Sequence, residues 1–185
     1  MIPREMLLEQ GVYAMEQNLT KKLYHAIHTL SPLFDFQENN HELPNVEITN
    51  KLVNMSYNPF LNRVRACVYD SPFLNTEIGE EAGHYIHFRK NPLFGKYSDE
   101  DGLEARHLIE CVGRFSGLVY SAFIGEKTKP ITDLQEDLIE THESSYNLAG
   151  FLFENFGESF LVKLGSINPH EFKKLKNCYQ AGDVK

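Results

Sequence analysis

The stretch Glu77–His87, EIGEEAGHYIH, carries an apolar and a polar pattern on one predicted helix. At about 100° per residue, the apolar side chains share one stripe, which is formed by Ile78, Ala82, Tyr85 and Ile86. Glu80, His84 and His87 fall together on the other side, with Glu81 beside them. Residues four apart lie one above the other, so Glu80 and His84 could hold one ion. From this helix alone, a solvated polar face is the favoured interpretation.

The flanking sequence predicts an α+β chain that is mainly helical. Apolar residues at helical spacing predict an opening helix over 3–30, which Pro32 ends, and 37–44 is expected to be a loop. The segment VEITNKLV predicts a short strand, and Tyr57–Tyr69 reads as a hairpin because Val64, Ala66 and Val68 alternate with polar neighbours. These strands are expected to form a small antiparallel sheet.

Helical periodicity returns after the hairpin and continues to the end of the sequence. Asn75 or Thr76 is predicted to cap the helix that contains Glu77–His87. Further helices are expected at about 101–124, 131–156 and 158–180, the last with a break near Asn168–Pro169. The order of elements is therefore one helix, a small sheet and then helices, which differs from alternating βαβ units.

Composition limits the possible classes of protein. With 185 residues, 42% of them hydrophobic, we expect one domain over 1–185: an N-terminal helix and loop at 1–45, a sheet with site helices at 46–125, and C-terminal helices at 126–185. A net charge of −8 argues against nucleic acid as a partner. The sequence shows no secretion signal and no bilayer-length apolar run, and its three cysteines are widely spaced, so a cytoplasmic protein without a membrane partner is expected.

From Val46 to about Leu164 the chain resembles the minimal gluzincin metallopeptidases, the zincin-like enzymes with an HExxH motif and a distant glutamate. The resemblance rests on the order of three segments: YNPFLNRVRACVYDS followed by NTEIGEEAGHYIH, then HLIECVGRFSG, then THESSYNLAGFLFENFGESFLVKL. It implies a hydrolase that binds zinc or another divalent metal. The implied ligands are Glu80, His84 and Glu110; Glu81 would be the general base, and Tyr146 or His142 the donor to the transition state.

Helical geometry gives a separate indication for Glu110. Leu108, Val112, Phe115 and Val119 form the apolar stripe of its helix, and Glu110 lies opposite, near Gly113 and Gly117. Two glycines on one face let another helix approach closely, so this face need not be solvated. An exposed surface acid is the alternative for Glu110.

The first histidine of the HExxH pattern is replaced by Glu80, which makes the ligand set more anionic and the bound water less acidic. Two functions follow from the resemblance. An active protein would hydrolyse peptide bonds by metal-activated water, with an extended peptide along the strand Arg63–Tyr69 as the sheet edge. A degenerate homologue would bind a peptide or protein segment on the same scaffold without catalysis.

Other arrangements of the same residue types remain open. Glu104–His107 is a second ExxH motif, and with Glu16 and Glu140 it could build a ferritin-like di-iron carboxylate site, although only a short loop separates the two motifs. His25 and His28 are expected to be structural, and so is Cys111.

Overall fold

The computed structural model describes residues 4–38, 41–49, 55–67, 74–92, 99–126 and 139–183. Along the chain the elements are α1 (Arg4–Leu30), the 3₁₀ helix η1 (Ser31–Phe34), β1 (Asn45–Thr49), β2 (Ser56–Asn58), β3 (Arg63–Cys67), α2 (Leu74–Lys90), α3 (Asp99–Phe123), α4 (Ile139–Phe156), α5 (Phe160–Leu164) and α6 (Pro169–Gln180). The predicted α+β class with mainly helical content is confirmed, and so are the opening helix and the break at Asn168–Pro169.

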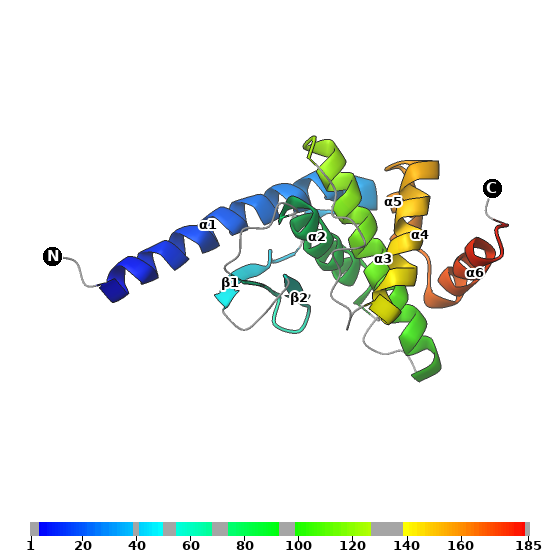
Figure 1. Ribbon diagram of the computed structural model, residues 1–185, viewed down its shortest axis with the longest axis horizontal. Helices are drawn as coiled ribbons and strands as arrows, with labels where there is room; N and C mark the ends of the chain where they lie inside the picture. The colour runs from blue at the N-terminus through cyan, green and yellow to red at the C-terminus, as the bar shows by residue number, and fades with distance from the viewer. Residues whose placement is uncertain are drawn as a thin grey trace.

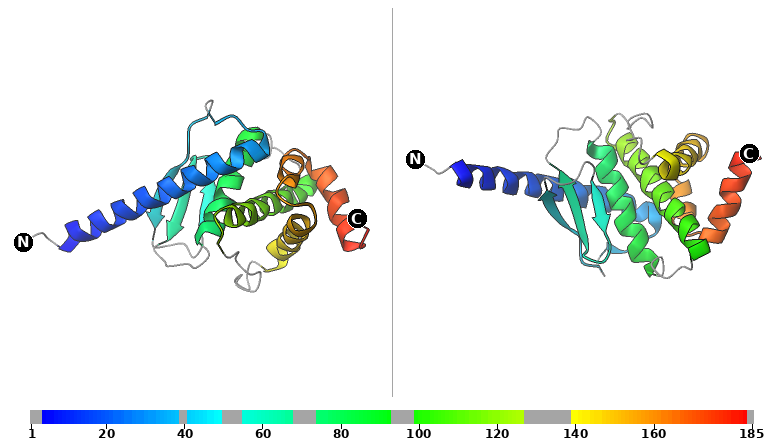
Figure 2. Two further views of the ribbon diagram at one scale, coloured as in Figure 1. Left: turned by 90° about the horizontal axis from the view of Figure 1, so that it is seen from above. Right: turned by 60° about the horizontal axis from the view of Figure 1, so that its bottom comes forward.

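Helix α2 lies in the middle of the molecule, between the small sheet and α3 (Figure 2). It packs on α1 and β2 on one side and along α3 on the other, and α4 and α6 cover the far side of α3 (Figure 1). The N-terminal half of α1 projects beyond the body of the protein. Buried apolar side chains from α1, α2, α3 and α4 form one continuous core, which includes Leu23, Tyr85, Phe115 and Leu148.

The sheet has three strands in the order β1-β3-β2. The predicted hairpin is confirmed, since β2 and β3 pair antiparallel, but β1 pairs parallel to β3 and the sheet is therefore mixed. Asn62, just before β3, explains this difference. Its side-chain amide donates to the carbonyls of Glu42 (3.1 Å) and Leu43 (3.2 Å), just before β1, so the two strands start side by side.

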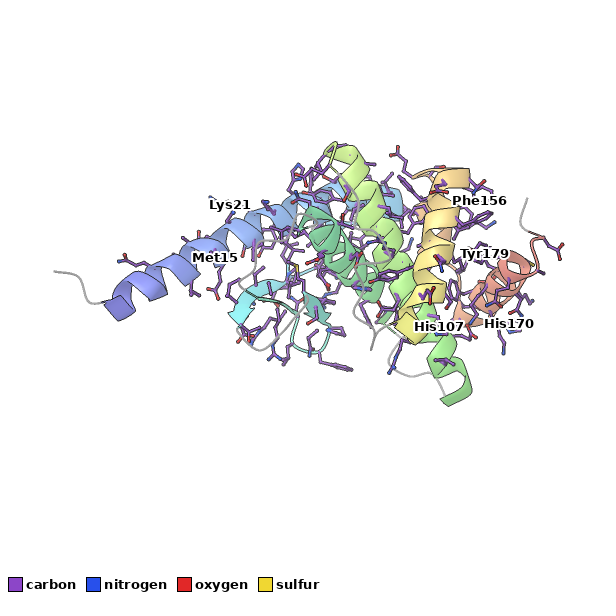
Figure 3. The ribbon with its side chains drawn as sticks, viewed as in Figure 1. Met15, Lys21, His107, Phe156, His170 and Tyr179 are labelled. Atoms are coloured by element: carbon purple, nitrogen blue, oxygen red, sulfur yellow. The ribbon has the colours of Figure 1, made fainter. Side chains whose placement is uncertain are left out.

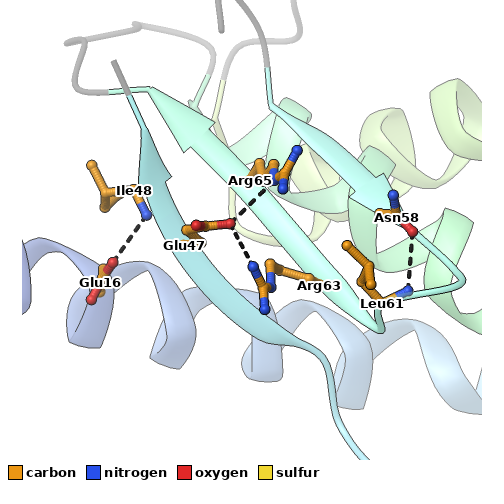
Figure 4. Close-up of polar contacts among 7 residues, drawn as sticks. All are labelled: Glu16, Glu47, Ile48, Asn58, Leu61, Arg63 and Arg65. Atoms are coloured by element: carbon orange, nitrogen blue, oxygen red, sulfur yellow. Dashed lines mark hydrogen bonds and ion pairs between the residues drawn. The ribbon is translucent and has the colours of Figure 1, made fainter. Parts of the chain in front are cut away.

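The position of β3 overturns one expectation. The strand at Arg63–Tyr69 was expected to be a free edge for a peptide, yet β3 is hydrogen-bonded on both sides and the edges are β1 and β2. The tight turn that joins β2 to β3 is held by Asn58, whose side-chain oxygen accepts from the backbone N–H groups of Phe60 and Leu61, each at 3.0 Å (Figure 4). A turn signal identifies the hairpin, but it carries no information about which strand pairs on the other side of β3.

The start of α2 also differs from expectation. The helix begins at Leu74, and the side chains of Asn75 and Thr76 do not cap it; Asn75 bonds Glu126, and Thr76 bonds Ser121 at 2.7 Å. Both side chains therefore tie α2 to the C-terminal end of α3. None of the helices in the described ranges has the length and apolar character needed to cross a membrane.

Candidate site between helices α2 and α3

Four glycines bring α2 and α3 into close contact. Gly79 and Gly83 lie on α2, and Gly113 and Gly117 lie opposite on α3. A Cβ atom at Gly83 would lie 2.3 Å from the Ser116 hydroxyl oxygen, and one at Gly117 would lie 2.6 Å from the Thr76 carbonyl oxygen. Both distances are far below van der Waals contact, so the helix backbones approach as only glycine allows. The close approach expected at Gly113 and Gly117 is confirmed.

The polar face of α2 is buried. Glu80 is 9% exposed, Glu81 is 5% exposed and the His87 side chain is fully buried, so a solvated face, the favoured interpretation of this helix alone, is wrong. Periodicity identified the polar face correctly, but periodicity does not say what covers that face. Buried charges are costly unless they are paired, so the partners of these groups define the site.

Glu80 is paired with a guanidinium group. One carboxylate oxygen accepts from Arg114 Nη1 at 2.8 Å, and the other accepts from the Tyr146 hydroxyl at 3.1 Å. The Arg114 guanidinium lies over the Tyr146 ring, 5.1 Å from its centroid, and Arg114 is only 3% exposed. Burial and the neighbouring carboxylates of Glu80 and Glu110 raise the pKa of Tyr146 well above its usual range, so its hydroxyl stays a neutral donor. We name Glu80, Arg114 and Tyr146 the guanidinium centre.

His84 and Glu110 lie beside this centre. His84 Nε2 is 4.0 Å from Glu110 Oε2, too far for a hydrogen bond but close enough for an electrostatic contact. The imidazole lies directly over Gly113, where a Cβ atom would be 2.3 Å from His84 Cε1. Within the described residues, the buried Nδ1 of His84 has no hydrogen-bond partner. The structure therefore brings all three residues of the expected ligand set, Glu80, His84 and Glu110, into one region.

Glu81 faces the sheet. The backbone N–H of Tyr57 in β2 hydrogen-bonds its carboxyl group, while Oε2 has no partner among the described residues. Burial, followed by the charges of Glu80 and Glu110, raises the pKa of Glu81 well above its ordinary value. The carboxyl group of Glu81 covers the outward amide of an edge strand.

The donor set does not fit a divalent metal in this arrangement. Both oxygens of Glu80 are already bound, and a dication held by the same carboxylate would lie about 4 Å from the Arg114 guanidinium. Two unit charges of the same sign at that distance repel by about 4 kcal/mol at an effective dielectric constant of 20, so the repulsion between a dication and the guanidinium would be roughly 8 kcal/mol. Among the residues that the structure describes, no three His, Cys, Asp or Glu side chains are arranged to hold a metal ion.

Arg114 was missed by the sequence analysis, although a signal was present. It lies four residues after Glu110, which places both side chains on one face of α3. His87 was assigned to the polar face with no role. It is buried, and desolvation lowers its pKa to about 3, so the imidazole is neutral. The His142 side chain, the alternative donor to Tyr146, lies outside the described residues.

The second ExxH motif has a different partner. Lys176 Nζ of α6 binds both oxygens of Glu104 at 2.7 and 2.6 Å and lies 3.1 Å from His107 Nδ1, so this motif joins α3 to α6. Glu16 accepts from the backbone N–H of Ile48 at 3.0 Å and lies at the sheet. The side chain of Glu140 lies outside the part of the chain that is described. Glu16 and the Glu104–His107 pair thus bind separate groups, not one shared ion.

The remaining candidates have structural partners. His25 Nδ1 is 2.9 Å from the Tyr120 hydroxyl, and His28 lies 3.5 Å from Glu38. Burial raises the pKa of the Cys111 thiol, which keeps it protonated and unreactive.

Comparison of the chain with protein families, with curated proteins and with solved structures finds no match. The class is therefore defined by the molecule alone: a mainly helical α+β protein with a buried carboxylate–guanidinium centre between two glycine-rich helix faces.

Proposed function

We propose that this protein is a zincin-like scaffold without peptidase activity, in which the Arg114 guanidinium takes the place of the catalytic metal. The order of segments supports kinship with the minimal gluzincins, and the two helices that would carry their ligands pack face to face here. The observation that carries the proposal is the occupation of both Glu80 oxygens by Arg114 and Tyr146. A guanidinium remains charged at every accessible pH, so it supplies a permanent counter-ion to Glu80.

The function that follows is binding of a peptide or protein segment. Glu81, the residue in the general-base position, is buried and hydrogen-bonded to β2, and both oxygens of Glu80 are engaged by Arg114 and Tyr146. The chain retains the small sheet and the core that would present a binding surface. These partners favour a binding role over metal-assisted hydrolysis.

Metal analysis of protein purified without chelator tests the proposal. We expect well below 0.1 equivalent of zinc, manganese or iron per chain, and no cleavage of a mixed fluorogenic peptide library with or without added zinc. Glu80→His alone is expected to leave zinc binding weak, because the guanidinium still repels the ion. The double variant Glu80→His/Arg114→Leu is expected to bind zinc at least tenfold more tightly than Glu80→His.

A matched control is Glu80→His/Arg106→Leu, since Arg106 is an exposed arginine on the same helix. It should bind zinc as weakly as Glu80→His. Wild-type protein that carries about one equivalent of tightly held metal, or that cleaves peptides in a metal-dependent way, refutes the proposal. That result would favour the metallopeptidase, for which the proximity of His84 and Glu110 is the supporting contact.

A further inference from the structure

A cleft of about 310 Å³ opens between α1 and the outer edge of β1. It lies on the opposite side of the sheet from the β2 edge that Glu81 covers. Its volume is at the lower end of the range of roughly 300–1,000 Å³ that is usual for ligand sites. The residues that line it come from one face of α1 and from the start of β1: Tyr13, Glu16, Gln17, Thr20, Lys21, Tyr24, Asn45 and Val46.

Two hydrogen bonds fix the direction of the β1 backbone. The N–H of Asn45 donates to the Asn62 carbonyl at 3.1 Å, on the β3 side. The N–H of Ile48 donates to Glu16 Oε1 at 3.0 Å, on the α1 side (Figure 4). Backbone groups alternate sides along a strand, so Val46, like Ile48, directs its N–H and C=O away from β3. These two groups of Val46 therefore face the cleft.

The outer edge of β1 is only partly covered. Glu16 binds the outward amide of Ile48, but no described residue binds the outward groups of Val46. An exposed strand edge of this kind is a template for pairing with another extended segment. Glu16 limits such pairing to the end of β1 that opens into the cleft.

We propose that this cleft binds an extended peptide segment whose backbone pairs with Val46 as an added strand. An incoming residue would donate its N–H to the Val46 carbonyl and accept from the Val46 N–H, as in other cases of strand addition. The Tyr13 and Tyr24 rings on α1 offer apolar surface to its side chains. This site is separate from the guanidinium centre and does not depend on whether that centre binds metal.

Lys21 sets the preferred charge of the segment. Its side chain is exposed on α1 (Figure 3), lines the cleft, and makes no ion pair with any described residue. The other charged group of the cleft, Glu16, is engaged with Ile48. A peptide with a carboxylate beside its pairing residue is therefore favoured over one with an ammonium group.

An NMR titration of ¹⁵N-labelled full chain with the peptide Ac-Thr-Val-Glu-Val-Thr-NH₂ tests the site. We expect the amide resonance of Val46 to move downfield and nearby α1 resonances to shift, with an affinity in the range of about 0.1–1 mM. Ac-Thr-Val-Lys-Val-Thr-NH₂ should bind several-fold more weakly. Ac-Thr-Pro-Pro-Pro-Thr-NH₂ cannot donate a hydrogen bond from its centre to the Val46 carbonyl and should bind much more weakly.

Two variants test separately the backbone pairing at Val46 and the charge preference set by Lys21. Val46→Pro removes the outward N–H without breaking the β1–β3 ladder, and it should weaken binding at least tenfold. Lys21→Ala should remove the preference for Glu over Lys in the peptide, whereas the control Lys22→Ala, at a residue that does not line the cleft, should keep it. If Val46→Pro does not fold, Thr20→Trp, which fills the cleft from α1, must abolish the shifts.

The proposal is overturned if the peptide causes no shifts at about 5 mM, or if the shifts lie only outside α1 and β1. Equal binding by wild type and a folded Val46→Pro or Thr20→Trp variant overturns it as well. Because these readouts involve neither metal nor activity, the site can fail while the proposed function stands, and the reverse also holds.

Discussion

Replacement of Gly117 by alanine should destabilise the protein, although alanine is the better helix former. At this position a Cβ atom would lie 2.6 Å from the Thr76 carbonyl oxygen and 2.7 Å from Glu80 Cγ. Thr76 presents a backbone atom of α2, which cannot turn aside as a flexible side chain can. Helix α2 would have to move away from α3 by roughly 1 Å, and the Glu80–Arg114 contact would be disturbed with it.

The magnitude follows from two opposing terms. Alanine gains about 1 kcal/mol over glycine in a helix interior, while overpacking a close contact costs about 1–3 kcal/mol and sometimes more. The matched control is Gly150→Ala in α4, where nothing lies within 4 Å of the new Cβ atom and only the gain applies. The gain is common to both variants, so they should differ by the overpacking cost of about 1–3 kcal/mol in the free energy of unfolding, with Gly117→Ala the less stable.

Thermal and urea unfolding followed by circular dichroism measures this difference. For a chain of this size, 1 kcal/mol corresponds to about 2–4 °C, so the midpoints should be separated by roughly 2–12 °C. The reasoning is refuted if Gly117→Ala unfolds at or above the wild-type midpoint while Gly150→Ala behaves as expected. That result would mean that α2 and α3 do not approach as closely as the glycines allow.

Three further predictions concern buried polar groups. Because the pKa of Glu81 is raised in the folded state, the free energy of unfolding should fall as the pH rises above about 4.5. Glu81→Gln should remove this loss, so urea titrations should show a stability gain of the variant over wild type that is larger at pH 8 than at pH 5. An equal gain at both pH values would contradict the prediction. His87, whose pKa is lowered to about 3, should cost stability as the pH falls below about 6.5, with a slope of up to about 1.4 kcal/mol per pH unit, and His87→Gln should flatten that slope in acid-unfolding curves. Lys176→Met should remove the counter-ion of the partly buried Glu104 and lower the free energy of unfolding in urea by about 3 kcal/mol. Lys173→Met, at an exposed lysine of the same helix, should change it little. Similar values for both variants would show that the α3–α6 ion pair is not stabilising.

The elements that the sequence predicted well are those with a strong local signal. The 3.6-residue period identified α1 and α3, and the alternation around Val64 together with the Asn58–Asn62 turn identified the hairpin. The parallel pairing of β1 was not accessible in this way. It depends on the Asn62 side chain reaching back to the segment before β1, a contact between residues about 20 positions apart that no local pattern encodes.

The site was predicted in part for a similar reason. The spacing of the motifs placed Glu80, His84 and Glu110 on helix faces that do meet, and the two glycines indicated the close approach. The partner of Glu80 was not foreseen, because an arginine on a helix is usually solvated and its pairing depends on the depth at which it lies. The burial of Arg114 follows from the packing of α4 over α3, which sequence periodicity does not specify.

The glycines and the guanidinium are linked by one physical constraint. Where Gly79 and Gly83 meet Gly113 and Gly117, water is excluded from Glu80, and on the other side of α2 the sheet covers Glu81. A carboxylate in such a place needs either a proton or a cation. Burial raises the pKa of Glu81, which favours its protonated form, and Glu80 is paired with the Arg114 guanidinium. A lysine at position 114 would neutralise Glu80 less reliably, because burial lowers the pKa of an ammonium group and the neutral form would leave Glu80 unpaired. The guanidinium stays charged and also stacks on the Tyr146 ring. Close packing of α2 on α3 is therefore compatible with a buried Glu80 carboxylate because the chain itself supplies a permanent cation at Arg114.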